Sequence, residues 1–328
     1  MIYPRVLCMG EVLLDCLADQ VGRPWPEVKS WTSYPGGAPA NVACALAKLG
    51  TAAGFIGCVG QDETGIALVE LLKTTGVEST GIQHHPEAPT RKVYVLRSEQ
   101  GDRTFAGFDE QLATTAFADA FLQAEQLPIQ LFDGAEFLVL GTLELAYPDT
   151  RAAIYRALEL AEQHYLKVVL DVNWRPVFWP QPAAAPRLIY DLIEQADFIK
   201  LSAQEAEWLF KTQDPGAIAR QLGDIEGVLV TSGEHGCAYY LAGNEGKLPP
   251  FPVEVEDTTG AGDGFIAGFI HQLCQRGLAS LRDPDAARQM VAYASAVGAL
   301  TTTRLGAIAG QPSVAEVEAF LYLQQNGH

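Results

Sequence analysis

Short apolar runs alternate with segments of helical periodicity along almost the whole chain. Strands are expected at residues 6–14, 54–59, 91–98, 137–141, 167–171, 198–201 and 228–231. Helices are expected at residues 40–49, 65–75, 150–164, 185–195, 203–210, 216–222, 260–275 and 286–300. The later strands are continuously apolar, as in a parallel sheet that helices cover on both faces. The pattern predicts an α/β fold of three layers, α/β/α, with a mostly parallel central sheet.

Two segments break this rhythm. Residues 16–36 hold three prolines and two tryptophans and are expected to be irregular. Residues 92–108 alternate more clearly, with a turn at 99–102, which indicates a β-hairpin. Together the two segments predict a small β-appendage over the edge of the main sheet.

Composition narrows the possible partners. The 328 residues, 48% apolar and 19% charged, suit one large α/β domain with a full core. Acidic residues outnumber basic ones 40 to 22, so the net charge of −18 repels nucleic acid and anionic membranes. Neither is expected as a partner. An anionic ligand must be bound by helix N-termini, backbone N–H groups, a few cations and a metal ion.

The six cysteines are scattered and form no Cys-x-x-Cys pair, so free thiols in a reducing cytoplasm are expected. The N-terminal residues resemble a first strand and not a secretory signal. No apolar run reaches the ~18 residues that a membrane crossing needs. The histidines lack zinc-site spacing, and His84-His85 are expected in a solvated loop.

The strongest chemical signal is Asp257-Thr258-Thr259-Gly260-Ala261-Gly262-Asp263, which opens a helix. The free N–H groups of a first helical turn and the helix dipole attract anions, and small residues let a phosphate approach the backbone. Asp263 is then an acid placed where a phosphoryl group would be held. No Gly-Lys-Ser/Thr follows, so this is not a Walker A loop. An ordinary helix start remains the alternative for this segment taken alone.

The second signal is Gly36-Gly37-Ala38-Pro39-Ala40-Asn41, in which two glycines enter a helix. Adjacent glycines let a ligand touch the main chain, and the Asn41 amide both donates and accepts hydrogen bonds. These properties suit a polyol ligand, although a Gly-Gly turn before a helix is common.

Together the two segments carry a resemblance. The chain resembles the ribokinase-like, or PfkB, family of carbohydrate kinases, which pairs a Gly-Gly-x-x-x-Asn segment with an Asp-Thr-x-Gly-Ala-Gly-Asp segment. Further matches are Asp15, residues 171–175, residues 231–236 and Gly306-Ala307. The resemblance covers essentially the whole chain. It implies a single ribokinase-like kinase domain over residues 1–328, with a small β lid formed by segments at about 12–36 and 90–110.

The resemblance also implies roles for individual residues. Asp263 would be the base that accepts the proton of the sugar hydroxyl, and a helix N-terminus should keep it ionised. The N–H groups of Gly260, Ala261, Gly262 and Asp263 would form the anion hole. The implied sugar-binding residues are Asp15, Gly36, Gly37, Asn41, Arg103, Glu144 and Asn173.

ATP and Mg²⁺ are the implied cofactors. The nucleotide would lie along Thr231, Gly233 and Gly236. The family's Asn-x-x-Glu segment near Mg²⁺ is Ser202-Ala203-Gln204-Glu205 here, so Glu205 is the better candidate for the metal region. Ser295 stands where many relatives carry Asn near the adenine. Asp257 and Thr259, with residues 301–310, match a region that binds a monovalent cation, K⁺, in several relatives.

Within the family, residues 141–144, 171–175 and 103–105 favour a fructokinase, which would convert fructose to fructose 6-phosphate. The alternatives are a kinase for 2-keto-3-deoxygluconate, ribose or a nucleoside, for which Trp25, Trp31, Phe105 or Phe108 could clamp the base. A sugar-phosphate substrate is disfavoured because no cationic cluster lies near the Gly-Gly segment. A non-catalytic sugar- or nucleotide-binding protein would be expected to lack Asp263 or the glycines. A dehydrogenase is disfavoured because no Gly-x-Gly-x-x-Gly follows the first strand. The lid also offers a sheet edge or face through which a homodimer could form.

Overall fold

The computed structural model describes residues 3–98, 103–109 and 112–326. Its centre is a nine-stranded sheet in the order β13-β12-β11-β10-β9-β8-β1-β4-β5. All neighbours from β11 to β5 are parallel, and β12 and β13 add an antiparallel edge. The strands are β1 (Val6–Met9), β4 (Ala53–Gly60), β5 (Glu78–His85), β8 (Phe137–Leu140), β9 (Lys167–Asp171), β10 (Phe198–Ser202), β11 (Gly227–Thr231), β12 (Cys237–Leu241) and β13 (Asn244–Leu248).

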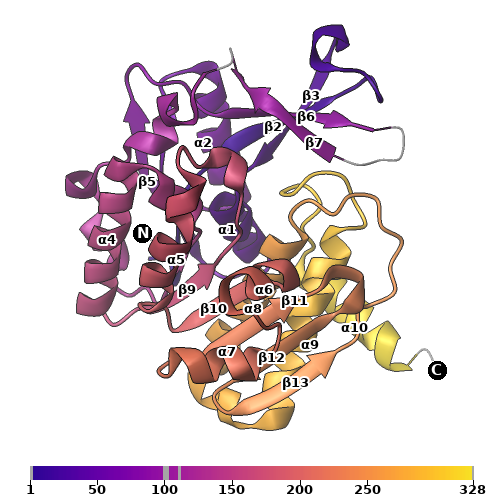
Figure 1. Ribbon diagram of the computed structural model, residues 1–328. Helices are drawn as coiled ribbons and strands as arrows, with labels where there is room; N and C mark the ends of the chain where they lie inside the picture. Colours follow the sequence, from indigo (N-terminus) through magenta and orange to yellow (C-terminus); the bar gives the residue numbers. More distant parts are fainter. Residues whose placement is uncertain (1–2, 99–102, 110–111, 327–328) are drawn as a thin grey trace.

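Helices cover both faces of this sheet, as the apolar strands predicted (Figure 1). One face is covered by α4 (Pro148–Gln163), α5 (Ala185–Ile193), α6 (Ala203–Phe210) and α7 (Pro215–Leu222). The other face is covered by α1 (Ala38–Lys48), α2 (Glu63–Thr75), α8 (Ala261–Arg276) and α9 (Pro284–Thr301). The short α3 (Ile129–Phe132) joins the first core, and α10 (Val314–Asn326) packs on α9. The expected three-layer α/β/α arrangement is confirmed.

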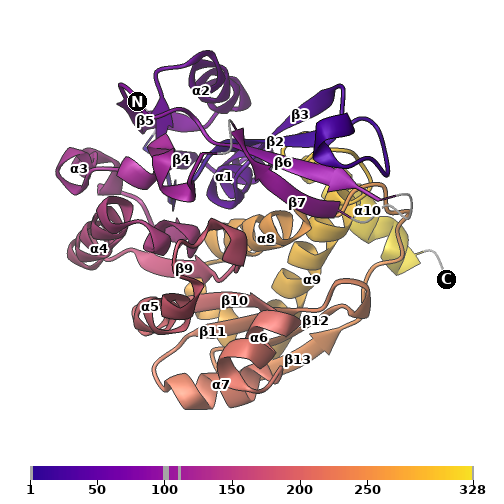
Figure 2. The same ribbon diagram turned by 45° about the horizontal axis from the view of Figure 1, so that its top comes forward.

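A second, four-stranded sheet stands apart from the central one in both views (Figures 1 and 2). Its order is β3 (Trp31–Gly36), β2 (Leu13–Ala18), β6 (Lys92–Arg97) and β7 (Arg103–Phe108). The expected single strand at 6–14 is wrong, because the chain leaves the central sheet after Met9 and enters the small sheet at Leu13. The irregular segment expected at 16–36 is also wrong in part, since it contains the second half of β2 and all of β3. The turn expected at 99–102 lies outside the described residues.

Other departures from the sequence pattern lie at the sheet edges. His84 and His85 end strand β5 and do not lie in a loop as expected. The ring of His85 accepts a hydrogen bond from the Ala88 N–H through Nδ1 at 2.7 Å. Strands β5 and β13 lie at the two edges of the sheet and were not expected, because a half-exposed edge strand mixes polar and apolar residues. Strand β12 was not expected either, although its five residues form a continuous apolar run.

The topology fixes where a ligand can bind. From β1 the chain adds β4 and β5 on one side, whereas β8, β9, β10 and β11 lie on the other. The strand order therefore reverses between β1 and β8. In open α/β sheets a crevice forms at the carboxyl ends of the strands at such a point. The residues that follow β1, β8, β9, β10 and β11 are thus gathered at one edge.

Candidate active site

The two segments singled out in the sequence meet at this edge. Helices α1 and α8 pack together on the same face of the sheet and both begin at its carboxyl side. Asn41 lies in the first turn of α1, and Asp263 lies in the first turn of α8. The Asn41 Nδ2 donates a hydrogen bond to Asp263 Oδ2 at 2.8 Å, across 222 residues of chain. Asn41 Oδ1 is buried and has no partner among the described residues, so it remains able to accept a hydrogen bond from a ligand.

Asp263 is almost completely buried, at 8% exposure. The pKa of its carboxyl is raised to about 6, mainly by burial and also by the nearby carboxylate of Asp171. Asn41, Lys200 and Arg175 act in the opposite direction. With a pKa of about 6 the carboxyl group is mostly ionised at neutral pH, and the groups that favour this form are Asn41, Lys200 and Arg175.

The start of α8 has the features of an anion hole. Gly260 precedes the helix with φ +80°, and a Cβ there would come within 2.8 Å of the Ala307 backbone. Glycine is required by both the backbone angle and the close approach. Gly262 and Asp263 follow at helix positions whose N–H groups have no partner within a helix. The Ala261 N–H instead donates to Thr258 O at 3.3 Å, which leaves Gly262 and Asp263 as the better donors.

The two glycines before α1 are packed against β2 and the turn that precedes it. A Cβ on Gly36 would collide with the carboxylate of Asp15, which is half-buried on β2. Gly37, at φ +104°, would collide with the backbone carbonyl of Glu11. The side chain of Glu11 accepts a hydrogen bond from the Ala38 N–H at 2.8 Å. These contacts bring Asp15 and the Gly-Gly turn together beside Asn41, as expected.

Glu144 lies at the same edge but deeper than its expected role suggests. It is in a 3₁₀ turn (Leu143–Ala146) and is 2% exposed. A Cβ on Gly10 would lie 2.6 Å from its Oε1. Burial raises the pKa of Glu144, and burial together with the nearby Glu144 raises that of Glu11 well above its usual range. Glu11 and Glu144 are therefore close neighbours, and Glu11 joins the pair to the start of α1 through the Ala38 N–H.

The segment expected near the metal forms a helix cap. Ser202 and Glu205 make a capping box at the start of α6, in which Ser202 Oγ accepts from the Glu205 N–H at 3.2 Å. Glu205 Oε2 accepts from the Ser202 N–H at 2.7 Å, and Oε1 accepts from the Trp174 N–H at 2.6 Å. Asn173, with φ +37°, places that N–H. Both oxygens of Glu205 are thus engaged, and each keeps a lone pair.

The residues expected to bind the nucleotide surround the end of β11. Thr231 ends this strand, and its hydroxyl donates to Leu201 O at 3.3 Å. Gly233 and Gly236 bound the next turn with φ +53° and +84°. Ser295 lies half-buried on α9, with Oγ 3.4 Å from Cys237 Sγ.

Asp257 and Thr259 organise the approach to α8. Asp257 Oδ1 accepts from the N–H and the hydroxyl of Thr259, at 2.9 and 2.7 Å. Its Oδ2 accepts from the Gly306 N–H at 3.1 Å, which joins this segment to the 301–310 loop. A Cβ on Gly306 would lie 3.2 Å from the Tyr34 ring of β3, so the same loop touches the small sheet. Across residues 3–98, 103–109 and 112–326, no three His, Cys, Asp or Glu side chains gather as a metal site requires.

Arg103 begins β7 and is paired in register with Arg97 of β6. The structure therefore places its backbone in the small sheet, as expected.

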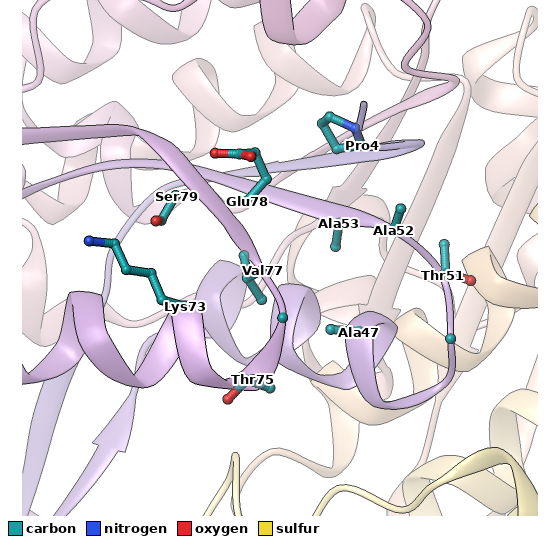
Figure 3. A pocket seen from close by; sticks show the side chains of 12 residues that line it. Pro4, Ala47, Thr51, Ala52, Ala53, Lys73, Thr75, Val77, Glu78 and Ser79 are labelled. Carbon is teal, nitrogen blue, oxygen red and sulfur yellow. The ribbon is translucent and has the colours of Figure 1, made fainter. Parts of the chain in front are cut away.

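A surface hollow lies elsewhere, at the opposite edge of the sheet (Figure 3). It is lined by Pro4, Ala47, Thr51, Ala53, Lys73, Val77 and Glu78, among others. Strands β1, β4 and β5 begin here, and helices α1 and α2 end here. A helix C-terminus presents carbonyl groups and repels anions. Among its lining residues Lys73 contributes a cation, but no helix N-terminus like the start of α8 faces this hollow.

Sequence reasoning missed one pair of charges in the site. Lys200 of β10 donates to both oxygens of Asp171 of β9, at 3.0 Å each. Both residues are buried, at 7% and 4% exposure. A signal existed, because Lys200 is a single cation inside an apolar strand, where an unpaired charge is very costly.

Comparison with known proteins identifies the family of this arrangement. The profile of the pfkB family carbohydrate kinases matches residues 4–314. The chain belongs to this family. It is a sugar kinase, a phosphotransferase with an alcohol group as acceptor, on a ribokinase-like fold whose small sheet is the lid.

Individual relatives agree with this assignment. Fructokinase-1 of Zea mays is 33% identical over 315 residues, which covers 95% of this chain and 96% of the maize protein. The fructokinase of Xylella fastidiosa with bound ATP superposes with a TM-score of 0.89 at 30% identity and covers 99% of this chain and 100% of its own. The fructokinase of Vibrio cholerae O395, in a fructose, ADP and calcium ion bound form, gives 0.83 at 28% identity, with 97% and 99% covered. None of the helices in the described parts of this kinase has the length and apolar character that a membrane crossing requires.

Proposed function

We propose that this kinase transfers the γ-phosphoryl group of ATP to fructose and forms fructose 6-phosphate. The observation that carries the proposal is the contact between Asn41 and Asp263, which joins the sugar segment to the phosphate segment. The similarity to fructokinases of maize, Xylella fastidiosa and Vibrio cholerae supports fructose as the acceptor.

Asp263 is the proposed base. Its carboxylate is buried beside the helix start, and with a pKa of about 6 it is mostly ionised at neutral pH. It accepts the proton of the attacking hydroxyl while the N–H groups at the start of α8 stabilise the charge on the transferring group. MgATP enters as the substrate that carries the phosphoryl group and its divalent ion. Phosphoryl transfer passes through a loose transition state, so positioning and charge stabilisation dominate over strong basicity.

The acceptor sugar lies between the lid and α1 in this proposal. The carboxylate of Asp15 accepts from its hydroxyl groups, and Gly36 and Gly37 let the sugar reach the backbone. Asn41 offers its unpaired Oδ1. Arg103, Glu144 and Asn173 complete the set of proposed sugar residues. Closure of the lid excludes water from the phosphoryl group.

The nucleotide side is proposed on the other half of the crevice. Thr231, Gly233, Gly236 and Ser295 line the ATP site, and Ser202 and Glu205 hold the Mg²⁺ region through the α6 cap. Asp257 and Thr259, joined to the 301–310 loop, are proposed to organise a site for K⁺. Replacing K⁺ in the assay with tetramethylammonium should lower kcat, and an unchanged rate argues against that ion.

The decisive experiment is a substrate panel. Fructose, ribose, 2-keto-3-deoxygluconate, adenosine and fructose 6-phosphate are each supplied with MgATP, and ADP release is measured. We expect the highest kcat/KM with fructose. A higher kcat/KM for another acceptor would contradict fructose and identify that acceptor as the substrate. If no acceptor causes release of ADP, a non-catalytic binding protein is favoured.

Two variants test the proposed roles of Asp263 as the base and of Asp15 in sugar binding. Asp263→Ala should lower kcat by about 10²–10⁴-fold, the usual contribution of a general base, while MgATP binding is retained. Asp15→Ala should raise KM for fructose more than for MgATP, since a hydrogen bond to a charged group contributes about 1.5–3 kcal/mol. Asp19→Ala, an exposed carboxylate just after β2, is the matched control and should change neither parameter. An unchanged KM for fructose in Asp15→Ala contradicts its role.

We further propose that residues 1–328 act as a single kinase domain in the cytoplasm, as a homodimer through the lid. The six cysteines are free and buried, which fits a reducing compartment. Light scattering coupled to size exclusion measures the mass directly, and a monomer at the concentration of the assay rules out a dimer.

A further inference from the structure

Lys200 is placed beneath the start of α8 by the alternation of β10. Side chains at successive strand positions face opposite sides, so Phe198 and Lys200 both face α8. Phe198 packs edge-to-face on Phe269, with ring centroids 5.8 Å apart. Lys200 then faces the first turn of the same helix. A Cβ on Gly262 would lie 2.8 Å from its Nζ, so the ammonium group touches the backbone of the anion hole.

Asp171 fixes the position of this ammonium group. The two residues are register partners on neighbouring parallel strands, and Nζ donates to both carboxylate oxygens. Burial lowers the pKa of Lys200, but Asp171, Glu205 and Asp263 together outweigh it and raise the pKa above its ordinary value. The side chain is therefore a permanent cation. A buried ion pair generally adds little stability over an apolar pair, so its place under the anion hole requires another explanation.

The charged and polar groups that face Asp263 come from every element around it. Asn41 from α1, Lys200 from β10 and Arg175 from the segment after β9 favour its ionised form. Asp171 from β9 disfavours that form. Lys200 and Asp171 thus act on the same carboxylate in opposite directions, although they are partners in one ion pair.

We propose that Lys200 is a positioning residue for phosphoryl transfer, which supports the Gly262 turn of the anion hole and keeps Asp263 charged against the repulsion of Asp171. This rests on the proposed role of Asp263 as base. The proposed action of the cation is on Asp263 and on the helix start.

The test uses Lys200→Met, Asp171→Asn and the double variant, with kcat/KM for fructose measured against pH at saturating MgATP. The acidic limb of this profile reports the base before fructose binds. Lys200→Met should move the limb upward by about 1 pH unit, and Asp171→Asn should move it downward by a similar amount. The double variant should return it close to the wild-type position. A purely structural ion pair would instead lose stability from either side, without opposed shifts.

A second readout is independent of turnover. Protein labelled with ¹³C at the aspartate carboxyl groups is titrated by NMR, and the resonance missing from Asp263→Asn identifies Asp263. The step from Asp171→Asn to the double variant isolates Lys200 without leaving Asp171 unpaired, so it applies even where Lys200→Met fails to fold. An upward shift of the Asp263 titration at this step supports the proposal, and no shift overturns it. If the shift occurs while Asp263→Ala retains normal turnover, the role of Asp263 as base fails but the action of Lys200 on it stands.

Discussion

At the scale of single residues, the burial of Asp263 should destabilise the ligand-free enzyme. Its pKa is raised from an ordinary 3.8 to about 6. The folded state therefore binds this proton more tightly than the unfolded state does. Stability is lost as the pH rises from 3.8 toward 6, and the penalty is complete above that value. At neutral pH the buried carboxylate of Asp263 therefore lowers the free energy of unfolding.

Asp263→Asn should remove this penalty. The amide keeps the size of the side chain, and its oxygen still accepts from Asn41. At about pH 8 the free energy of unfolding should rise by up to about 3 kcal/mol, since one pKa unit corresponds to about 1.36 kcal/mol. At about pH 5 the gain should be roughly half as large, because wild-type Asp263 is then mostly protonated when folded. Urea unfolding of the ligand-free proteins at both pH values measures the difference.

The matched control for this experiment is Asp191→Asn, which changes an exposed carboxylate on α5. Its stability should equal that of the wild type at both pH values. A loss of stability in Asp263→Asn at the higher pH would show that the carboxylate is better accommodated than its burial indicates.

At the scale of elements, one buried arginine fastens the lid to the rest of the fold. Arg91 immediately precedes β6, and its backbone carbonyl accepts from the Leu14 N–H of β2. Its guanidinium group binds Asp119 through two hydrogen bonds of 2.6 and 2.7 Å. It also lies 4.5 Å from the centroid of the Phe117 ring and 5.2 Å from that of Phe108, at the end of β7. The start of β6 is thus fixed to the rest of the fold by an ion pair with Asp119 and by cation–π contacts with two phenylalanine rings.

Arg91→Met should therefore destabilise the enzyme strongly. It leaves the buried Asp119 without its cation, a change that costs about 3–5 kcal/mol in comparable buried pairs. The double variant Arg91→Met, Asp119→Asn removes both charges and should recover part of the loss. Denaturant unfolding followed by circular dichroism measures all three proteins. Equal losses in the single and double variants would show that packing of the arginine matters and its charge does not.

The sequence could predict the elements whose pattern is set by burial on both faces, such as the central strands ending at Asp171 and Ser202. It could not separate β1 from β2, because the apolar pattern continues past Gly10 while the chain changes sheet. The paired motifs predicted that Asn41 and Asp263 belong to one site, and the structure confirms that the two residues are in contact. It could not find what Lys200 faces, because its partner lies 29 residues away and only the strand register brings them together.

At the scale of the whole molecule, the five tryptophans of the chain report on the two halves of the crevice separately. Trp25 and Trp31 lie together on the lid, with ring centroids 5.3 Å apart. Trp174 stacks on Trp208 at 4.8 Å and contacts Trp179 in the body of the fold. The N–H of Trp174 is bonded to Glu205, on the nucleotide side. Lid closure over the sugar should therefore change the fluorescence of Trp25 and Trp31. Binding of the nucleotide should change the fluorescence of the cluster around Trp174.

Replacing one cluster at a time by phenylalanine tests whether the crevice works as two halves. In Trp25→Phe, Trp31→Phe, the fluorescence change caused by fructose should largely disappear, while that caused by MgADP is retained. In Trp174→Phe, Trp179→Phe, Trp208→Phe, the opposite result is expected, because the remaining emitters lie on the lid. Both variants keep the backbone N–H that binds Glu205 and all proposed sugar residues, so KM values should stay near wild type. If fructose alone changes the body cluster as strongly as MgADP does, sugar binding rearranges the nucleotide half as well, and the halves do not respond independently.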